Sequence, residues 1–188
     1  MDDGSESDTL DTLYIEGVVT DTEGNVIEGA KVEIWHANGL GTYSFFDKRQ
    51  SEFNLRRTIL ADKAGHYLAQ TTMPVGYGCP PEGTTQALLN KLGRHGNRPS
   101  HVHYFVSAPG YRKLTTQFNI EGDQYLWDDF AFATRDGLVA VAVDVSDAAE
   151  LQRLGATAPV KHITFNVELV KDQATAPTSE VDRRRVAA

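Results

Sequence analysis

The chain has 188 residues, of which 40% are hydrophobic and 23% are charged. These proportions are typical of one globular domain and exclude a disordered chain or a fibrous repeat. The formal net charge of -8 excludes binding to nucleic acid through a basic surface, and no apolar stretch is long enough to cross a bilayer. The single cysteine, Cys79, favours a reducing compartment, so we expect a cytoplasmic protein with neither nucleic-acid nor membrane partners.

Alternation of apolar and polar residues predicts about seven strands, separated by turn sequences rich in Gly, Asn, Asp and Pro. In the second of them Val32, Ile34 and His36 share one face, which indicates a half-buried strand. Strands without long intervening helices favour a mainly β fold, an antiparallel β-sandwich, over a parallel α/β sheet. The predicted strands are 14–20, 31–36, 66–70, 101–107, 113–120, 138–144 and 162–170.

Two short helices and long loops that carry the active site complete the expected sandwich. The first helix covers 84–93, with a threonine cap and a terminal glycine, and the second opens at Asp147 and ends at Gly155. We expect residues 1–13 to form a loop or linker, 14–170 the β-sandwich domain and 171–188 a flexible polar tail.

His101 and His103 are the first residues that indicate chemistry. Residues two apart on a strand project from the same face, about 6.6 Å apart along it, so two imidazoles there can bind one metal ion. An isolated pair of this kind is more often two half-exposed polar residues. Here Arg98 lies just upstream, and a Gly- and Pro-rich loop at 75–83 precedes it, which favours a site.

Tyrosines are the alternative ligands, because no cysteine pair and no His-Glu helix motif is present to form a zinc site. Tyr43 follows the strand 31–36, and Tyr77 lies between two glycines. Either could instead be an aromatic residue at the rim of a site. A phenol titrates near pH ~10, so it binds as phenolate only to a strong Lewis acid, and phenolate with imidazole suits trivalent iron.

Three segments, 35–43, 73–81 and 98–103, read WHANGLGTY, MPVGYGCPP and RPSHVH. Together they resemble the intradiol ring-cleaving dioxygenases, most closely the members that cleave catechol, and the similarity spans nearly all of residues 1–170. The resemblance implies one non-haem Fe(III) per chain, held by Tyr43, Tyr77, His101 and His103. It also implies two residues beside the substrate, Arg98 and Gln117, and two that line its pocket, Phe130 and Ala131.

The resemblance implies that catechol and dioxygen are the substrates and that cis,cis-muconate is the product, in the catabolism of aromatic compounds. Tyr77 would leave the metal as catechol binds and take one of its protons. Arg98, a permanent cation, would stabilise the negative charge that builds on the substrate during the reaction.

The resemblance implies a helical amino-terminal region of roughly a hundred residues, comparable to a small domain, which we expect to be missing from this chain. That region supplies the homodimer interface, a lipid-binding groove and part of the substrate pocket. We therefore expect a catalytic fragment that holds iron and turns over weakly, with its oligomeric state open. The alternatives are an intradiol enzyme for hydroxyquinol, chlorocatechol or protocatechuate, and a non-catalytic β-sandwich binding module.

Other reactive side chains are expected to have structural roles. Cys79 has no base nearby in the sequence and is interpreted as an inert loop thiol. The inward register of His36 predicts a hydrogen-bonded core histidine, and the adjacent acids Asp128 and Asp129 are expected to be solvated at a helix start. No partner pattern is visible for the remaining histidines, His66, His95 and His162.

Overall fold

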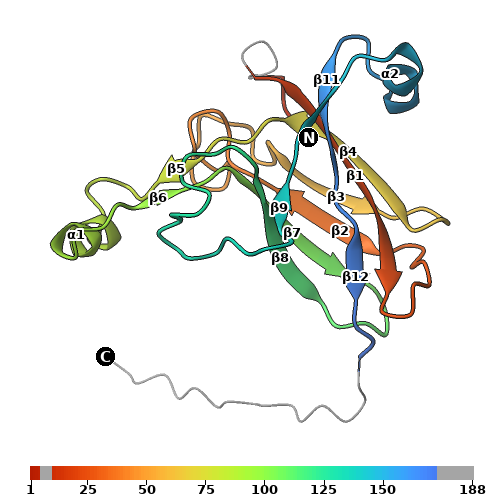
Figure 1. The fold of residues 1–188 in the computed structure, drawn as a ribbon, viewed down its shortest axis with the longest axis horizontal. Helices are drawn as coiled ribbons and strands as arrows, with labels where there is room; N and C mark the ends of the chain where they lie inside the picture. Colours follow the sequence, from red (N-terminus) through yellow and green to blue (C-terminus); the bar gives the residue numbers. More distant parts are fainter. Residues whose placement is uncertain (5–9, 173–188) are drawn as a thin grey trace.

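A computed structural model describes residues 1–4 and 10–172 (Figure 1). None of the helices in this part of the chain is long and apolar enough to span a membrane. The elements in chain order are β1 (Thr12–Asp21), β2 (Lys31–Trp35), β3 (Arg56–Leu60), β4 (His66–Thr72), β5 (Tyr77–Gly78), α1 (Thr84–Lys91), β6 (Asn97–Arg98), β7 (His101–Ser107), β8 (Leu114–Ile120), β9 (Val139–Ala140), β10 (Val143–Val145), α2 (Ala148–Leu154), β11 (Val160–Thr164) and β12 (Val167–Leu169).

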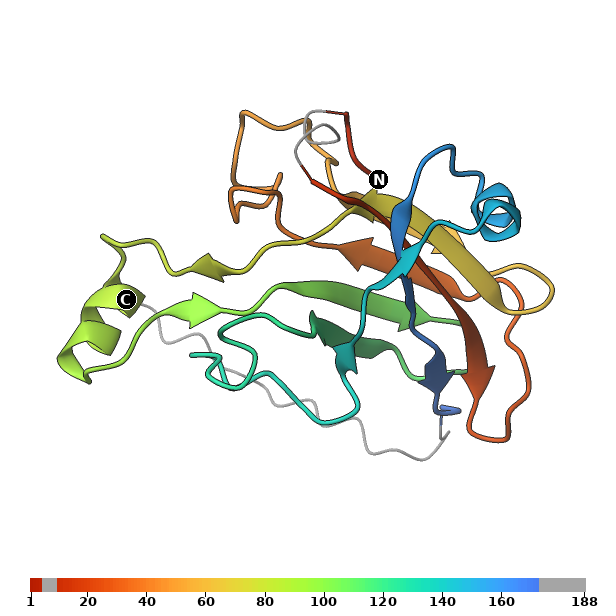
Figure 2. The ribbon, with the colours of Figure 1, turned by 45° about the horizontal axis from the view of Figure 1, so that its top comes forward.

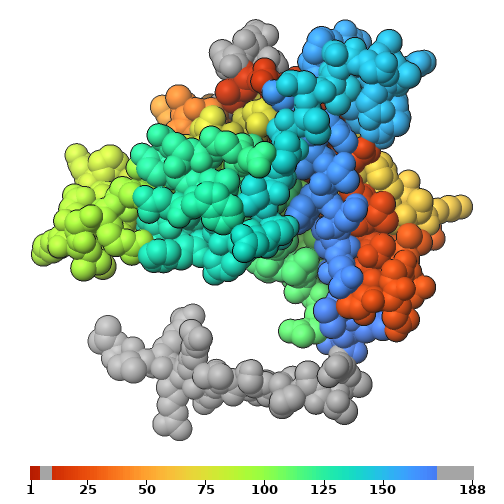
Figure 3. All heavy atoms as spheres, in the orientation of Figure 1, coloured from red at the N-terminus to blue at the C-terminus, as the bar shows by residue number. Residues whose placement is uncertain are grey.

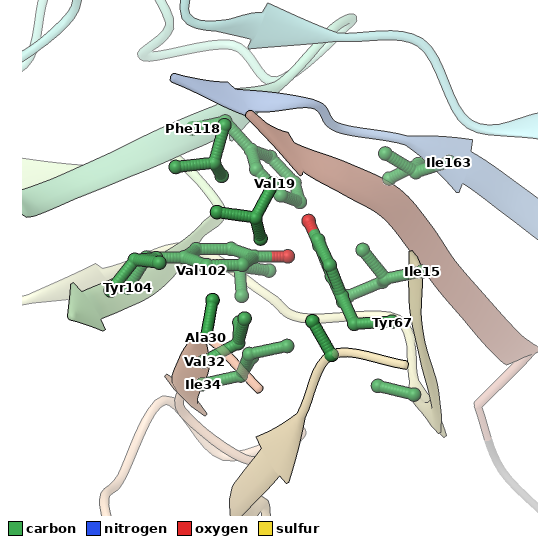
Figure 4. Packing of buried hydrophobic residues seen from close by; sticks show 14 of the residues in the cluster. Ile15, Val19, Ala30, Val32, Ile34, Tyr67, Val102, Tyr104, Phe118 and Ile163 are labelled. Atoms are coloured by element: carbon green, nitrogen blue, oxygen red, sulfur yellow. The ribbon is translucent and has the colours of Figure 1, made fainter. Parts of the chain in front are cut away.

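Two five-stranded sheets pack face to face and form the sandwich (Figure 1). The first has the order β10-β11-β1-β12, with β4 on the other side of β1, and the second has the order β3-β2-β7-β8-β9. Large rings fill the space between them, and Figure 4 shows Tyr67, Tyr104 and Phe118 there among aliphatic side chains of both sheets. The tyrosine rings lie edge to face with centroids 6.2 Å apart. The expected mainly β sandwich is confirmed.

The first sheet contains parallel pairs that the alternation did not predict. The segment predicted as one strand, 162–170, is two short strands, both parallel to β1: β11 pairs with its first half and β12 with its second half. Between them the chain bends over Gly17, where a Cβ would lie only 2.0 Å from the carbonyl oxygen of Phe165. The bend therefore needs a glycine at this position of β1.

Three further local predictions are corrected. The segment 138–144 changes sheets, since β9 pairs with β8 in the second sheet and β10 with β11 in the first. The edge strand β3 escaped prediction because its charged sequence, RRTIL, lacks alternation. α1 begins after Gly83 without a side-chain cap, whereas α2 has the predicted cap at Asp147 and ends at Gly155 with a φ of 73°.

The segment between β4 and β7 extends from the sandwich as an arm (Figures 2 and 3). β5 and β6 pair antiparallel at its base, and α1 forms its tip. This pairing sets Tyr77 directly opposite Arg98. The arm therefore brings two candidate site residues that are distant in the sequence to the same end of the second sheet.

The predicted domain limits stay predictions, although their surroundings are visible. β1 begins at Thr12, two residues before the predicted strand. Of the predicted tail, only 171 and 172 lie in the described part of the chain, where Lys171 forms a β-bridge with Tyr111. The remainder of the tail, 173–188, lies outside the described residues.

Candidate metal centre

The two histidines of β7 face outward from the sandwich. Their neighbour Val102 has no exposed surface and points into the core, so His101 and His103 project from the opposite face of the second sheet. The Nε2 atoms of the two rings lie 3.1 Å apart. Trp35 lies opposite His103 on β2, and its indole stacks on the imidazole with an interplanar angle of 12°.

Tyr43 and Tyr77 reach the same point from two loops. Tyr43 lies between β2 and β3, and Tyr77 opens β5 in the arm. Their hydroxyl oxygens lie 3.0 Å apart. The loops approach closely at Gly41, which has a φ of 73° and whose added Cβ would lie 2.7 Å from the Cβ of Tyr77. A glycine is needed there both for the left-handed backbone and for the contact.

The four predicted ligands therefore place their donor atoms around one point. The Tyr43 oxygen lies 3.2 Å from His103 Nε2 and 3.4 Å from His101 Nε2, and the Tyr77 oxygen lies 3.5 Å from His101 Nε2. Donor atoms about 2 Å from a single ion have separations of this size. Among the described residues, no group of three or more His, Cys, Asp and Glu could hold a metal, so the phenols are needed to complete the set.

The protonation states of these groups suit metal binding. Burial and the charge of Arg98 lower the pKa of His101 to about 4, while burial and the two neighbouring groups, His101 and Arg98, lower that of His103 to about 3. Both rings are therefore neutral at pH 7. His101 Nδ1 donates to the carbonyl of Pro99 at 2.6 Å, which leaves the Nε2 lone pair directed at the other donors. Burial, together with the neighbouring Tyr77, raises the pKa of Tyr43, so its ionisation needs a strong Lewis acid.

Arg98 and Gln117 lie beside the donor set, and their roles toward substrate stay predictions. One terminal nitrogen of Arg98, Nη1, is 3.0 Å from His101 Nε2, and the other, Nη2, donates to Gln117 Oε1 at 3.1 Å. Arg98 is 9% exposed. Burial acts to lower the pKa of its guanidinium, but the neighbouring carboxylate of Asp129 outweighs burial and raises it. The site therefore holds a permanent, directed cation.

Asp129 is the site residue that sequence reasoning missed. The expectation of two solvated acids holds for Asp128, whose side chain is 81% exposed and pairs with His95 at 3.0 Å. It is wrong for Asp129, which is 3% exposed and contacts Arg98 through both carboxylate oxygens at 3.2 Å. Burial would raise the pKa of Asp129, but Arg98 and two backbone amides outweigh it and lower the pKa. Nothing in the neighbouring residues of the sequence distinguishes the buried acid from the exposed one.

A cavity of about 920 Å³ opens beside the donor set. Its lining includes Tyr43, Tyr77, Arg98 and His103, and aromatic rings form much of the remaining wall, contributed by Trp35, Phe45, Phe46, Phe53 and Phe105. Flat aromatic ligands fit such a surface. Gln117, Phe130 and Ala131 are not among the described residues that line it, so the pocket role of Phe130 and Ala131 stays a prediction.

The other histidines bond to residues outside the donor set. His36 is buried and hydrogen-bonded to Thr71 and Ala37, at 2.7 and 2.8 Å, so the prediction of a core histidine is confirmed. His66 and His162 both contact Glu16, a pairing that the sequence did not reveal. Cys79 is a free, half-buried thiol.

Comparison with known proteins agrees with this geometry. A family model described as "Dioxygenase" matches residues 1–170. The chain belongs to this dioxygenase family. It is 73% identical over 177 residues to catechol 1,2-dioxygenase of Acinetobacter guillouiae, with 94% of this chain and 58% of the relative covered. It is 50% identical over 189 residues to catechol 1,2-dioxygenase of Acinetobacter baylyi, with 100% and 60% covered.

A solved structure is similar over the whole chain. The crystal structure of wild-type Acinetobacter radioresistens catechol 1,2 dioxygenase superposes with a TM-score of 0.91 at 80% sequence identity. The superposition covers 100% of this chain and 61% of that one. The chain thus spans about three fifths of the length of the relatives that it matches.

Proposed function

We propose that this chain is the catalytic domain of an intradiol dioxygenase that cleaves catechol with dioxygen to cis,cis-muconate at a non-haem Fe(III) site. The observation that carries the proposal is the convergence of the donor atoms of Tyr43, Tyr77, His101 and His103, five of whose six pairs are separated by 3.0–3.5 Å. Membership of the dioxygenase family and the catechol 1,2-dioxygenase names of two similar proteins support it.

The donor set fits ferric iron better than a softer metal. Two phenolates are hard anionic ligands, and two neutral imidazoles add nitrogen donors without charge, so three positive charges are largely balanced. Ferric iron held by these four residues would supply Lewis-acid chemistry, making a ring carbon of catechol reactive toward dioxygen. His101, held through Nδ1 by the carbonyl of Pro99, presents Nε2 to the metal in a fixed orientation.

Tyr77 is the residue that we assign to proton transfer. It lies in β5 of the arm, whereas Tyr43 lies in the loop that follows β2, and both line the cavity. If the Tyr77 oxygen left the donor set, a position would be open for substrate, and that oxygen would hold a proton from one catechol hydroxyl. The site therefore supplies its own base.

Arg98 is the residue that we assign to charge stabilisation. Its Nη1 lies 3.0 Å from His101 Nε2 and so at the edge of the metal position, while Gln117 holds Nη2. A directed cation in a site with few waters stabilises negative charge on the ring oxygens more strongly than it would in bulk solvent. The aromatic rings that line the cavity offer flat apolar surface against which the substrate ring would pack.

Iron binding is tested by loading the chain with ferric iron and recording iron content and the visible absorption spectrum. We expect a tyrosinate charge-transfer band that scales with iron, changes in Tyr77→Phe and is unchanged in Tyr111→Phe, a control in the β7–β8 connection. A folded, colourless and iron-free chain would contradict the metal site and leave the binding-module alternative.

Substrate choice is tested separately on the iron-loaded chain. Catechol, hydroxyquinol, a chlorocatechol and protocatechuate are supplied with dioxygen, and the ring-opened products are identified by mass and absorbance. We expect the highest kcat/KM with catechol. An iron-loaded, coloured chain that opens none of these rings would contradict the proposed activity without contradicting the metal site.

A further inference from the structure

The buried carboxylate of Asp129 makes four hydrogen bonds. Its Oδ1 accepts from Arg98 Nε at 3.2 Å and from the backbone amide of Ala131 at 3.0 Å, and its Oδ2 accepts from Arg98 Nη2 at 3.2 Å and from the amide of Ala133 at 3.2 Å. A carboxylate has about four lone-pair positions, so the acceptor capacity of Asp129 is filled. None of the bonds goes to solvent-exposed side chains.

This arrangement fixes the plane of the guanidinium. Two parallel hydrogen bonds to one carboxylate define both the position and the rotation of an arginine head group. With Nε and Nη2 held, Nη1 is the nitrogen left facing His101. Gln117 accepts a second hydrogen bond from Nη2 and completes the restraint.

The carboxylate is itself held rigidly. The amides of Ala131 and Ala133 belong to the segment that follows it, and that segment is attached to the arm because Phe130 N donates to the carbonyl of Asn97 at 3.1 Å. Asn97 is the residue directly before Arg98. The two ends of the ion pair thus belong to one hydrogen-bonded unit.

We propose that Asp129 is a positioning residue for Arg98: it directs Nη1 at the metal-facing edge of the site and balances the charge of a buried cation. The effect of Asp129 on turnover rests on the proposed function, whereas its effect on the orientation of the Arg98 guanidinium does not depend on catalysis. Asp129 touches neither the four donors nor the main cavity in the described part of the chain, so it acts through Arg98.

Substitution of Asp129 has a definite expected effect. In Asp129→Asn the amide nitrogen faces guanidinium N–H groups, so at least one of the two parallel bonds is replaced by a contact between donors, and Arg98 stays buried without its anion. The guanidinium then rotates or withdraws. In enzymes generally, removal of one hydrogen-bond donor that faces the negative charge of the transition state lowers kcat roughly a hundredfold or more. Misorientation of the Arg98 donor is therefore expected to lower kcat about 10- to 100-fold.

The first measurement uses the iron-free chain and does not depend on activity. Hydrogen exchange of the arginine Nε–H groups is followed by ¹⁵N NMR, with the Arg98 signal assigned by its loss in Arg98→Lys. We expect slow exchange in the wild type, at least tenfold faster exchange in Asp129→Asn, and no change in Asp128→Asn, the adjacent exposed acid. Unchanged slow exchange in a folded Asp129→Asn would overturn the proposal.

The second measurement uses the iron-loaded chain. We expect Asp129→Asn to keep the iron content and to lower kcat 10- to 100-fold while KM for catechol changes less than about threefold. A fall in kcat with wild-type guanidinium exchange would overturn the proposed route through Arg98. If the wild type has no turnover, the proposed function fails, and the NMR result still decides the positioning role.

Asp129→Glu keeps the inference testable if the asparagine variant does not fold. The extra methylene retains the charge but shifts the carboxylate, so the two arginine bonds and the two amide bonds cannot all be kept. We expect the Arg98 Nε–H to exchange faster than in the wild type, and kcat to lie between those of the wild type and Arg98→Lys. Wild-type values of both in folded Asp129→Glu would show that the position of the carboxylate is immaterial and would overturn the proposal.

Discussion

Replacement of Glu16 by glutamine is expected to destabilise the folded chain at neutral pH and to weaken its response to acid. Glu16 is 9% exposed on the outer face of the first sheet. Its carboxylate accepts two hydrogen bonds from Arg153 of α2, at 2.6 and 2.9 Å, and one from each of two histidines, His66 of β4 at 2.9 Å and His162 of β11 at 2.8 Å. Each histidine can donate its Nε2–H while neutral.

The magnitude follows from the pKa of Glu16. Hydrogen bonds from Arg153 are the largest cause, and burial opposes them; together with the histidines they lower the pKa from 4.5 to about 2. At about 1.4 kcal/mol per pKa unit this corresponds to ~3 kcal/mol. Because the Arg153 side chain is 45% exposed, solvent screening reduces the expected effect to about 2 kcal/mol.

The sign of the pH dependence is fixed by the lowered pKa. The unfolded chain binds a proton at Glu16 near pH 4.5, and the folded chain binds it only near pH 2. The contribution of the Glu16 carboxylate to the free energy of unfolding is therefore full above pH 4.5 and is lost as the pH falls toward 2. Urea denaturation followed by circular dichroism at several pH values measures the free energy of unfolding. The difference between wild type and Glu16→Gln should be about 2 kcal/mol at pH 7 and shrink between pH 5 and 2.

The matched control is Glu150→Gln, which removes the second acid on Arg153. Glu150 contacts Arg153 at 2.7 Å from the exposed side of α2, so its removal should change stability little. The reasoning is refuted if both variants lose equal stability at pH 7. It is also refuted if the effect of Glu16→Gln does not change with pH.

Two further substitutions test the core and the approach of the loops. Phe118 has no exposed surface, and the centroid of its ring lies 4.9 Å from that of Phe165. Phe118→Ala should therefore lower the free energy of unfolding, measured by urea denaturation, by about 3–5 kcal/mol, whereas Val143→Ala, at an exposed position, should change it little. A loss below ~1 kcal/mol in Phe118→Ala would contradict the packing. Gly41→Ala should lower iron content and charge-transfer absorbance per chain, because the added Cβ would collide with Tyr77. Gly110 also has a positive φ but lies in open space, so Gly110→Ala should retain both iron and absorbance. Equal loss in the two variants would contradict this account.

The alternation of apolar and polar residues in the sequence predicted most of the strands and which side chains of each strand point into the core. Val32, Ile34 and His36 are buried as predicted, and the His101 and His103 side chains share one face of β7. Both results follow from the period of two, which depends only on local backbone geometry. The residue types at the site were also readable, because phenol and imidazole donors in loops and on one strand face indicate a metal.

The tertiary structure decided which of these residues meet. The two-residue alternation along a strand shows which side of the sheet a side chain faces, but not which strand lies beside it. It therefore did not show that β11 and β12 run parallel to β1, or that the segment 138–144 passes from one sheet to the other. The same holds for ion pairs between residues far apart in the sequence. Asp128 and Asp129 are adjacent acids, yet the path of the chain exposes one and buries the other against Arg98.

The sequence by itself therefore determined the mainly β fold, the faces of its central strands and the donor chemistry of the candidate centre. Only the tertiary structure placed that centre on the outer face of the second sheet, set Tyr77 opposite Arg98 across the base of the arm and gathered two histidines and an arginine around Glu16. The physical reason is that local backbone preferences act over a few residues. The partners of a buried charge depend on the tertiary path of the chain, because the paired residues lie 31 to 146 positions apart in the sequence.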